Sequence, residues 1–191
     1  IGANGKGKST LLRIIANADK DFTGKNETGH NVSTTFFAQH QLEALHLENG
    51  ILQELQAFAP KHTETELRSI LGCFLFTGDD AFKKIRVLSG GEKSRVALAK
   101  ALTADANFLI HDEPTNHLDI QSVNILIQAL QQFEGTLIAV SHDRYFLDSV
   151  ANEIIEIDRG QLFRYKGNYA YYLEKKQQRE EILKAEVSKA R

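Results

Sequence analysis

The stretch GANGKGKS, residues 2–9, decides the fold. It satisfies the pattern G-x-x-x-x-G-K-[S/T], in which glycines let successive backbone N–H groups turn toward an anion. The apolar run from Thr10 to Ala16 that follows predicts a helix, whose amino end favours negative charge. The stretch therefore predicts a phosphate-binding loop, and a glycine-rich turn that matches by chance is the alternative.

Two side chains of this loop have specific predicted roles. Lys8 is placed to reach the β- and γ-phosphates of a nucleotide, and the Ser9 hydroxyl to bind Mg²⁺. The residues predicted to contact the nucleotide here are Gly2, Asn4, Gly5, Lys6, Gly7, Lys8, Ser9 and Thr10.

Composition favours a single globular domain with or without an appendage. The 191 residues are 42% hydrophobic and 25% charged, which is ordinary for a domain with its own core. No apolar run approaches the roughly 18 residues that span a bilayer, and no secretory leader is visible, so we expect a cytoplasmic protein without membrane insertion. The single cysteine, Cys73, lies in the apolar run CFLF and is predicted to be a buried, unreactive thiol.

The order of apolar and polar segments predicts an α/β fold. Expected strands are residues 34–38, 107–111 and 136–140, and expected helices are residues 50–59, 63–76, 89–104, 120–132 and 144–150. Segments 153–158 and 161–165 are expected to pair as a hairpin across Arg159 and Gly160. Residues 166–191 are charged and rich in helix formers, which predicts a solvated helical tail or linker, with an RNA-binding basic surface as the alternative.

A second chemical signal is the apolar run from Phe108 that ends in Asp112 and Glu113. Nucleotide hydrolases place such carboxylates beside the phosphate loop, so Asp112 is predicted to hold Mg²⁺ and Glu113 to orient or deprotonate the attacking water. A strand that ends in a solvated turn is the alternative. His111 stands where an aliphatic residue is expected, and we predict a hydrogen-bonded core histidine rather than a catalytic one.

A third signal is LSGGE, residues 88–92, where two glycines at a helix start expose N–H donors beside the Ser89 hydroxyl. One chain cannot readily aim two anion sites at a single triphosphate. The economical arrangement is two such domains face to face, each capping the nucleotide of the other, and a simple helix cap is the alternative. The predicted nucleotide contacts of this segment are Ser89, Gly90, Gly91 and Glu92.

Together these motifs resemble the nucleotide-binding domain of ATP-binding-cassette (ABC) proteins across nearly the whole chain. The resemblance implies ATP and Mg²⁺ as cofactors, and it adds three site residues. Gln39 is similar to the loop glutamine that contacts Mg²⁺ and the catalytic water. His142 is similar to the switch histidine at the γ-phosphate, and Asp119 to the aspartate that communicates across the paired domains.

The same resemblance implies a P-loop NTPase core with a mostly parallel sheet flanked by helices. The nucleotide-binding domain would span residues 1–165, with a helical subdomain at about 42–104 and the tail at 166–191. An N-terminal antiparallel β-subdomain, with the adenine-stacking aromatic and the strand before Gly2, is missing from this sequence. We therefore expect a piece of a longer polypeptide that binds ATP poorly in isolation.

Three longer segments resemble the ABC-F group: DEPTNHLD at 112–119, SHDRYFLD at 141–148 and GNYAYYL at 167–173. That group is soluble, carries two cassettes in one polypeptide and acts on the ribosome, with its rRNA and tRNA, in translation regulation. Residues 40–87 are too few for the helical arm of a first cassette, which favours a second cassette, although the tail could instead begin the linker after a first one. A transporter's nucleotide-binding subunit, a DNA-maintenance ATPase and a binding module that scarcely hydrolyses ATP are the alternatives.

Overall fold

The computed structural model describes residues 1–37, 44–116 and 118–189. The chain forms two compact units. The smaller unit joins Ile1–Lys8 to Ser141–Arg191, and the larger unit is Ser9–Val140.

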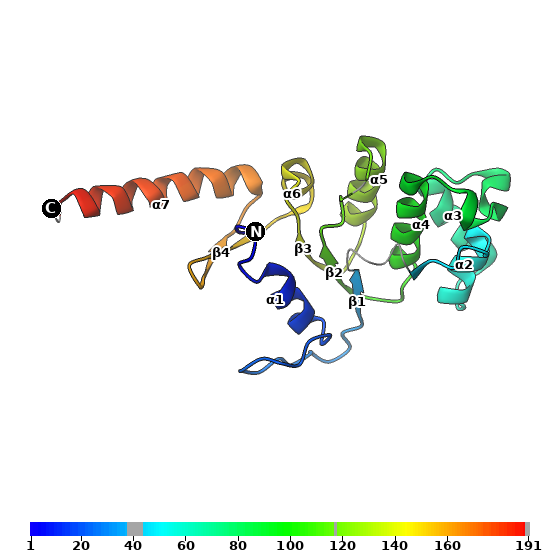
Figure 1. The fold of residues 1–191 in the computed structure, drawn as a ribbon, viewed down its shortest axis with the longest axis horizontal. Helices are drawn as coiled ribbons and strands as arrows, with labels where there is room; N and C mark the ends of the chain where they lie inside the picture. Colours follow the sequence, from blue (N-terminus) through cyan, green and yellow to red (C-terminus); the bar gives the residue numbers. More distant parts are fainter. Residues whose placement is uncertain (38–43, 117, 190–191) are drawn as a thin grey trace. The chain divides into compact units, whose positions relative to one another are not determined.

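A three-stranded parallel sheet is the centre of the larger unit (Figure 1). Its strands are β1 (Thr34–Phe37), β2 (Phe108–Asp112) and β3 (Thr136–Val140), in the order β1-β2-β3. The register places Ile110 of β2 between Phe36 and Ile138. Parallel strands are covered on both faces, which explains their continuous apolar runs and confirms the predicted α/β class.

Helix α1 (Lys8–Ile15) covers one face of this sheet. Leu12 is buried against Ile110 and Val140, and the end of the helix packs beside the same cluster. Ile15, the last residue of α1, lines a pocket together with the first residues of all three strands. The helix therefore ends at the amino ends of the strands, and its first turn lies toward their carboxyl ends.

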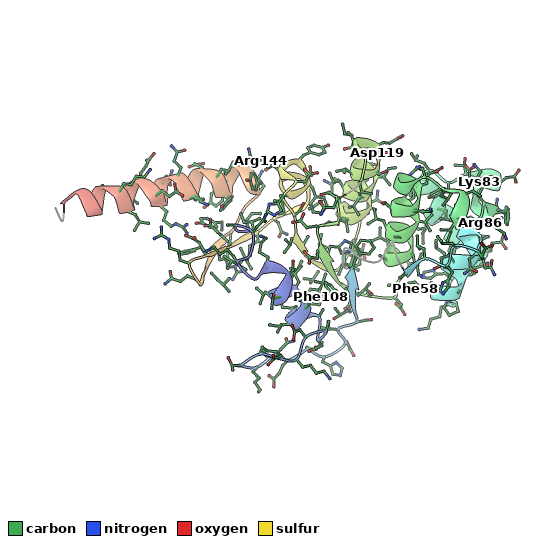
Figure 2. All side chains as sticks on the ribbon, viewed as in Figure 1. Phe58, Lys83, Arg86, Phe108, Asp119 and Arg144 are labelled. Carbon is green, nitrogen blue, oxygen red and sulfur yellow. The ribbon has the colours of Figure 1, made fainter. Side chains whose placement is uncertain are left out.

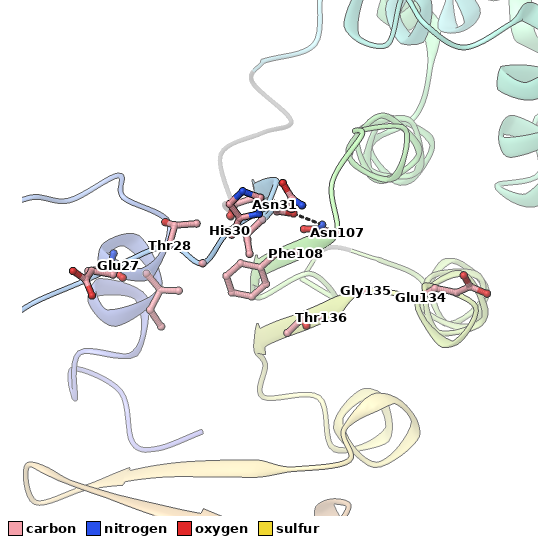
Figure 3. Close-up of a pocket in the computed structure, with 14 residues that line it drawn as sticks. Glu27, Thr28, His30, Asn31, Asn107, Phe108, Glu134, Gly135 and Thr136 are labelled. Atoms are coloured by element: carbon pink, nitrogen blue, oxygen red, sulfur yellow. Dashed lines mark hydrogen bonds between the residues drawn. The ribbon is translucent and has the colours of Figure 1, made fainter.

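The helical part of the larger unit comprises α2 (Ile51–Phe58), α3 (Glu64–Cys73) and α4 (Gly90–Leu102). Two short 3₁₀ helices that the sequence did not predict, η2 (Gly78–Phe82) and η3 (Ile85–Val87), join α3 to α4. Leu55, Leu67 and Leu71 are fully buried between the helices. Helix α5 (Ile120–Gln131) lies with α4 on the face of the sheet opposite to α1 (Figures 1 and 3).

The prediction of a buried Cys73 is wrong, because its side chain is exposed. Helix α3 continues through Cys73, so the helical period decides which side chains face the core. Leu67 and Leu71, four residues apart, occupy the buried face, while Cys73 points away from it. The apolar residues after Cys73 suggested burial, but they follow the end of the helix, and it is Phe74 that is buried there.

The smaller unit contains α6 (Arg144–Val150), β4 (Ile154–Asp158), β5 (Gln161–Tyr165) and α7 (Tyr169–Lys189). Strands β4 and β5 form the predicted hairpin. Arg159 and Gly160 both have positive φ, 49° and 75°, as a two-residue type I′ turn requires. No helix within the described ranges has the length and apolar character needed to cross a bilayer.

The first residues of the chain lie along β4. The amino group of Ile1 donates to the carbonyl oxygen of Ile155 at 2.8 Å, and the N–H of Ile157 donates to the carbonyl oxygen of Ile1 at 2.9 Å. Gly2 follows so closely that a Cβ atom there would lie 2.6 Å from the carbonyl oxygen of Ile157. The base of the glycine-rich loop is thus fixed to a strand from the far end of the sequence.

Candidate functional site

The glycine-rich loop has the conformation that its sequence predicts. Gly5 and Gly7 have φ of 74° and 85°, in the left-handed region where glycine is favoured, and residues 3–7 are exposed. The Lys8 side chain folds back over the loop, only 8% exposed, and its Nζ donates to the carbonyl oxygens of Gly2 and Ala3 at 2.8 and 3.0 Å. The loop therefore concentrates positive charge behind an exposed backbone.

Ser9 and Thr10 occupy the first turn of α1, and both are exposed. This turn lies toward the carboxyl ends of the strands, where β2 ends in Asp112. Its N–H groups precede the first intrahelical hydrogen bond, which is the arrangement that favours an anion at a helix start. The Ser9 hydroxyl thus belongs to the edge of the sheet that carries the acidic pair.

Asp112 and Glu113 end β2 in different ways. The Oδ1 atom of Asp112 is buried and has no hydrogen-bond partner among the described residues. Glu113 follows the strand with a backbone φ of 52°, which is uncommon for a residue other than glycine. Its N–H donates to the carbonyl oxygen of Val140 at 2.8 Å. The backbone therefore leaves the strand direction at Glu113, directly after Asp112.

A buried carboxylate oxygen without a hydrogen bond suits a cation, because an unpaired buried charge is costly. Mg²⁺ usually takes one or two carboxylates and keeps several waters, and Asp112 with the Ser9 hydroxyl offers such a partial ligand set. Across the described ranges, no cluster of three or more His, Cys, Asp or Glu side chains could form an all-protein metal cage. The residues present therefore fit Mg²⁺ bound together with a nucleotide.

His111 is a core residue, as predicted. Its ring is fully buried and stacks on Phe37, with 5.3 Å between ring centroids, and burial lowers its pKa from 6.5 to about 4. The predicted hydrogen bond is not found, since neither ring nitrogen has a partner within the described ranges. Because side chains alternate along a strand, His111 points to the face opposite to Asp112.

The segment Ser89–Glu92 forms the amino end of α4. The Ser89 Oγ accepts from the Glu92 N–H at 3.3 Å, and the Ser89 N–H donates to the Glu92 carboxylate at 2.8 Å, a reciprocal capping box. These hydrogen bonds lower the pKa of Glu92. The cap and the predicted anion site coexist, because Ser89 and Gly90 stay exposed and the N–H groups of Gly90 and Gly91 precede the intrahelical ladder.

Asp119 lies beside this segment at the amino end of α5 (Figure 2). Its Oδ1 accepts from the Ser122 N–H at 2.7 Å, and its Oδ2 is 3.8 Å from the position of a Cβ at Gly91. Hydrogen bonding from Ser122, with a smaller effect from the Arg95 charge, lowers the pKa of Asp119. The start of α4 and the Asp119 carboxylate therefore form one surface, exposed at Ser89, Gly90 and Asp119. We call it the signature face and define it as Ser89–Gly91 and Asp119.

His142 lies in the smaller unit, exposed, between buried Ser141 and the α6 cap residue Asp143. The Asp143 N–H donates to the Ser141 Oγ at 3.1 Å, and the Asp143 carboxylate accepts from the Phe146 N–H at 3.1 Å. This turn fixes the backbone on which His142 stands. Gln39 lies outside the described residues, so its role stays a prediction.

A pocket of about 640 Å³ lies at the opposite edge of the sheet (Figure 3). It is lined by the first residues of the three strands and by exposed polar residues of the segment after α1, including Glu27 and Thr28. It therefore lies at the strand ends far from Asp112 and Glu113. We do not assign it to the nucleotide.

A glycine-rich loop that leads into a helix, with carboxylates at the end of a parallel strand, defines a phosphate-loop nucleotide-binding domain. A family model described as ABC transporter matches residues 1–116, and a second model with the same description matches residues 155–191. The chain belongs to this ABC family.

Curated relatives identify the branch. YdiF of Bacillus subtilis (strain 168), whose name describes an ATP-binding protein, is 46% identical over 184 residues, which are 96% of this chain and 28% of YdiF. ABC transporter F family member 5 of Arabidopsis thaliana is 43% identical over 92% of this chain and 25% of its own length. The chain thus resembles ABC-F cassettes and spans about a quarter of the length of these relatives.

A solved structure supports the fold. The RNase-L Inhibitor matches with a TM-score of 0.66 at 27% identity, over 82% of this chain and 30% of its own.

Proposed function

We propose that this chain is an ATP-hydrolysing cassette that works against a second cassette, either in the same polypeptide or in a dimer mate. One observation carries the proposal: Ser89, Gly90 and Asp119 of the signature face are exposed, and the Asp119 carboxylate lies beside the first turn of α4, whose N–H groups precede the intrahelical ladder. Exposed donors at a helix start attract an anion, and the γ-phosphate of ATP on the opposite cassette supplies one.

Within the cassette we assign the roles that the sequence motifs predict. Lys8 and the first turn of α1 bind the phosphates, and Asp112 with the Ser9 hydroxyl holds Mg²⁺. When bound, Mg²⁺ neutralises charge on the phosphate oxygens. Glu113, which leaves β2 on its own path, orients and deprotonates the attacking water, with His142 and Gln39 in support.

Hydrolysis removes the phosphate that both cassettes bind, so the pair opens. Binding of ATP would close the pair and hydrolysis would release it, which is a clamp driven by nucleotide. The resemblance of three sequence segments to the ABC-F group implies the ribosome, with its rRNA and tRNA, as the object on which the full-length protein closes.

The test uses the full-length protein and its Glu113→Gln variant. Purified wild type should hydrolyse ATP with Mg²⁺, and the variant should keep ATP bound and remain in the closed state. In a sucrose gradient with ATP, the variant should sediment with ribosomes more than wild type does. An absence of hydrolysis in wild type would refute the enzymatic part, and co-purification with a membrane subunit instead of ribosomes would refute the ribosomal part.

A further inference from the structure

A buried carboxylate in the smaller unit has no role in the hydrolysis described above. Glu156 of β4 is only 2% exposed. Two of its hydrogen bonds come from cations of α7, Lys176 Nζ at 2.6 Å and Arg179 Nη2 at 2.9 Å. Two more come from the hydroxyls of Tyr172 at 3.0 Å and Tyr165 at 3.3 Å.

These contacts attach α7 to the hairpin over about two turns. Burial alone would raise the pKa of Glu156, but the hydrogen bonds from Lys176 and Tyr172 outweigh it and keep the carboxylate ionised. The Arg179 guanidinium also stacks on the Phe163 ring of β5, 4.0 Å from its centroid. A buried charge that is paired in this way strongly penalises any movement that separates its partners.

The same strand carries the base of the phosphate-binding loop. The backbone of β4 on either side of Glu156 bonds to Ile1, through the carbonyl oxygen of Ile155 and the N–H of Ile157. Gly2 then lies against Ile157 without room for a side chain. One residue of β4 therefore connects α7, through its side chain, with the loop, through its neighbours' backbone.

Beyond Arg179, α7 continues for ten more residues, about 15 Å of helix at 1.5 Å per residue. Its side chains from Glu180 to Ala185 are exposed, and Ile182 and Leu183 are 59% and 52% accessible. A partner that binds this exposed part of α7 would displace the helix against the turns that contain Lys176 and Arg179. Those turns are held by the Glu156 carboxylate.

We propose that Glu156 is a positioning residue that couples α7 to the phosphate-binding loop, so that whatever engages α7 changes the affinity of the loop for nucleotide phosphates. The effect on nucleotide affinity rests on the proposed function. The contacts of Glu156 with α7, and those of its neighbours with the loop, do not depend on it. Glu156 itself touches no substrate. It acts by fixing β4 between the helix and the loop.

The experiment compares Glu156→Gln with Glu153→Gln in the full-length protein. Glu153 is the matched control, because it directly precedes β4 and pairs with Arg164 of β5, and among the described residues it has no ion pair or hydrogen bond with α7. In Glu156→Gln, hydrogen exchange of α7 amides should become about 10- to 100-fold faster, the loss expected for hydrogen bonds to a charged group. Exchange in residues 3–8 should also become faster without nucleotide, and the KM for ATP should rise about fivefold or more while kcat stays within about twofold.

Each outcome bears on a separate part of the proposal. Faster exchange in α7 with an unchanged loop and an unchanged KM would overturn the coupling, and unchanged exchange in α7 would overturn the anchor. If Glu156→Gln does not fold, Tyr172→Phe removes one hydroxyl partner of Glu156 and of Lys176, and it should show the same pattern with smaller changes. Wild type without ATPase activity would refute the proposed function, whereas the exchange of residues 3–8 would still test the coupling.

Discussion

The Nζ atom of Lys8 lies 2.8 Å from the carbonyl oxygen of Gly2, so the loop that is proposed to bind phosphate holds its lysine on its own backbone. Phosphate oxygens can replace these carbonyl partners without moving the helix that carries Lys8. Lys8→Ala should therefore raise the Kd for ATP by roughly 10- to 100-fold, the range for a hydrogen bond to a charged group. Titration calorimetry would measure it, with Lys25→Ala, an exposed lysine paired with Glu27, as control. Equal affinity in the two variants would contradict the assignment.

Glu113→Gln should separate binding from turnover. The substitution keeps the size of the side chain but removes its capacity to accept a proton, so hydrolysis should slow by roughly 10²- to 10⁴-fold. Affinity for ATP should change little. Single-turnover kinetics would measure the loss, with the exposed Glu134, at the other end of the sheet, changed to Gln as control. A normal rate in Glu113→Gln would show that another group is the base.

Asp119 caps α5 and is proposed to serve a paired cassette, and substitution can separate these two roles. Asn is as good a helix cap as Asp, so Asp119→Asn should unfold at nearly the same urea concentration as wild type, whereas Asp119→Ala should lose about 1 kcal/mol. If the charge serves the paired cassette, both variants should reduce ATP hydrolysis by the full-length protein severalfold. Normal hydrolysis in Asp119→Asn would show that Asp119 acts only as a helix cap and that its charge is not needed.

His111 should make the stability of the domain depend on pH. Its pKa falls from 6.5 in an unfolded chain to about 4 in the folded one, so the unfolded state binds the proton more readily. The contribution of neutral, buried His111 to the free energy of unfolding is fully present above about pH 6.5. It is lost as pH falls toward 4, by a total of roughly 3 kcal/mol. In His111→Leu, the free energy of unfolding should depend less on pH between about 6.5 and 4. Urea unfolding at a series of pH values would measure it, and an unchanged slope in the variant would contradict the assignment.

Local patterns predicted the elements well. The bounds of β3 and α6 agree with the expected ranges. The hairpin turn predicted at Arg159 and Gly160 is also present, and both residues have the positive φ that such a turn requires. The predicted helix at 63–76 was too long, because Leu75 has a φ of 65° that an α-helix cannot contain. Apolarity alone did not distinguish the end of the helix from the buried chain after it.

Side-chain environments were harder to predict, because they depend on residues far along the chain. The burial of His111 follows from strands on both of its sides, and the exposure of Cys73 from the direction of one helical turn. Glu156 was missed altogether, although it is charged within an apolar strand and cations recur in the helix that follows. The candidate site residues were predicted from motifs, while the reciprocal hydrogen bonds between Ser89 and Glu92 emerged only from the structure.

The bond between Ile1 and Ile155 joins residues 154 positions apart. During synthesis, the phosphate-binding loop therefore leaves the tunnel long before the strand that fixes its base exists. The hairpin of β4 and β5, by contrast, closes across two residues and can form in microseconds. The loop is consequently synthesised well before the contact that fixes its base, and that contact can form only after β4 has been made.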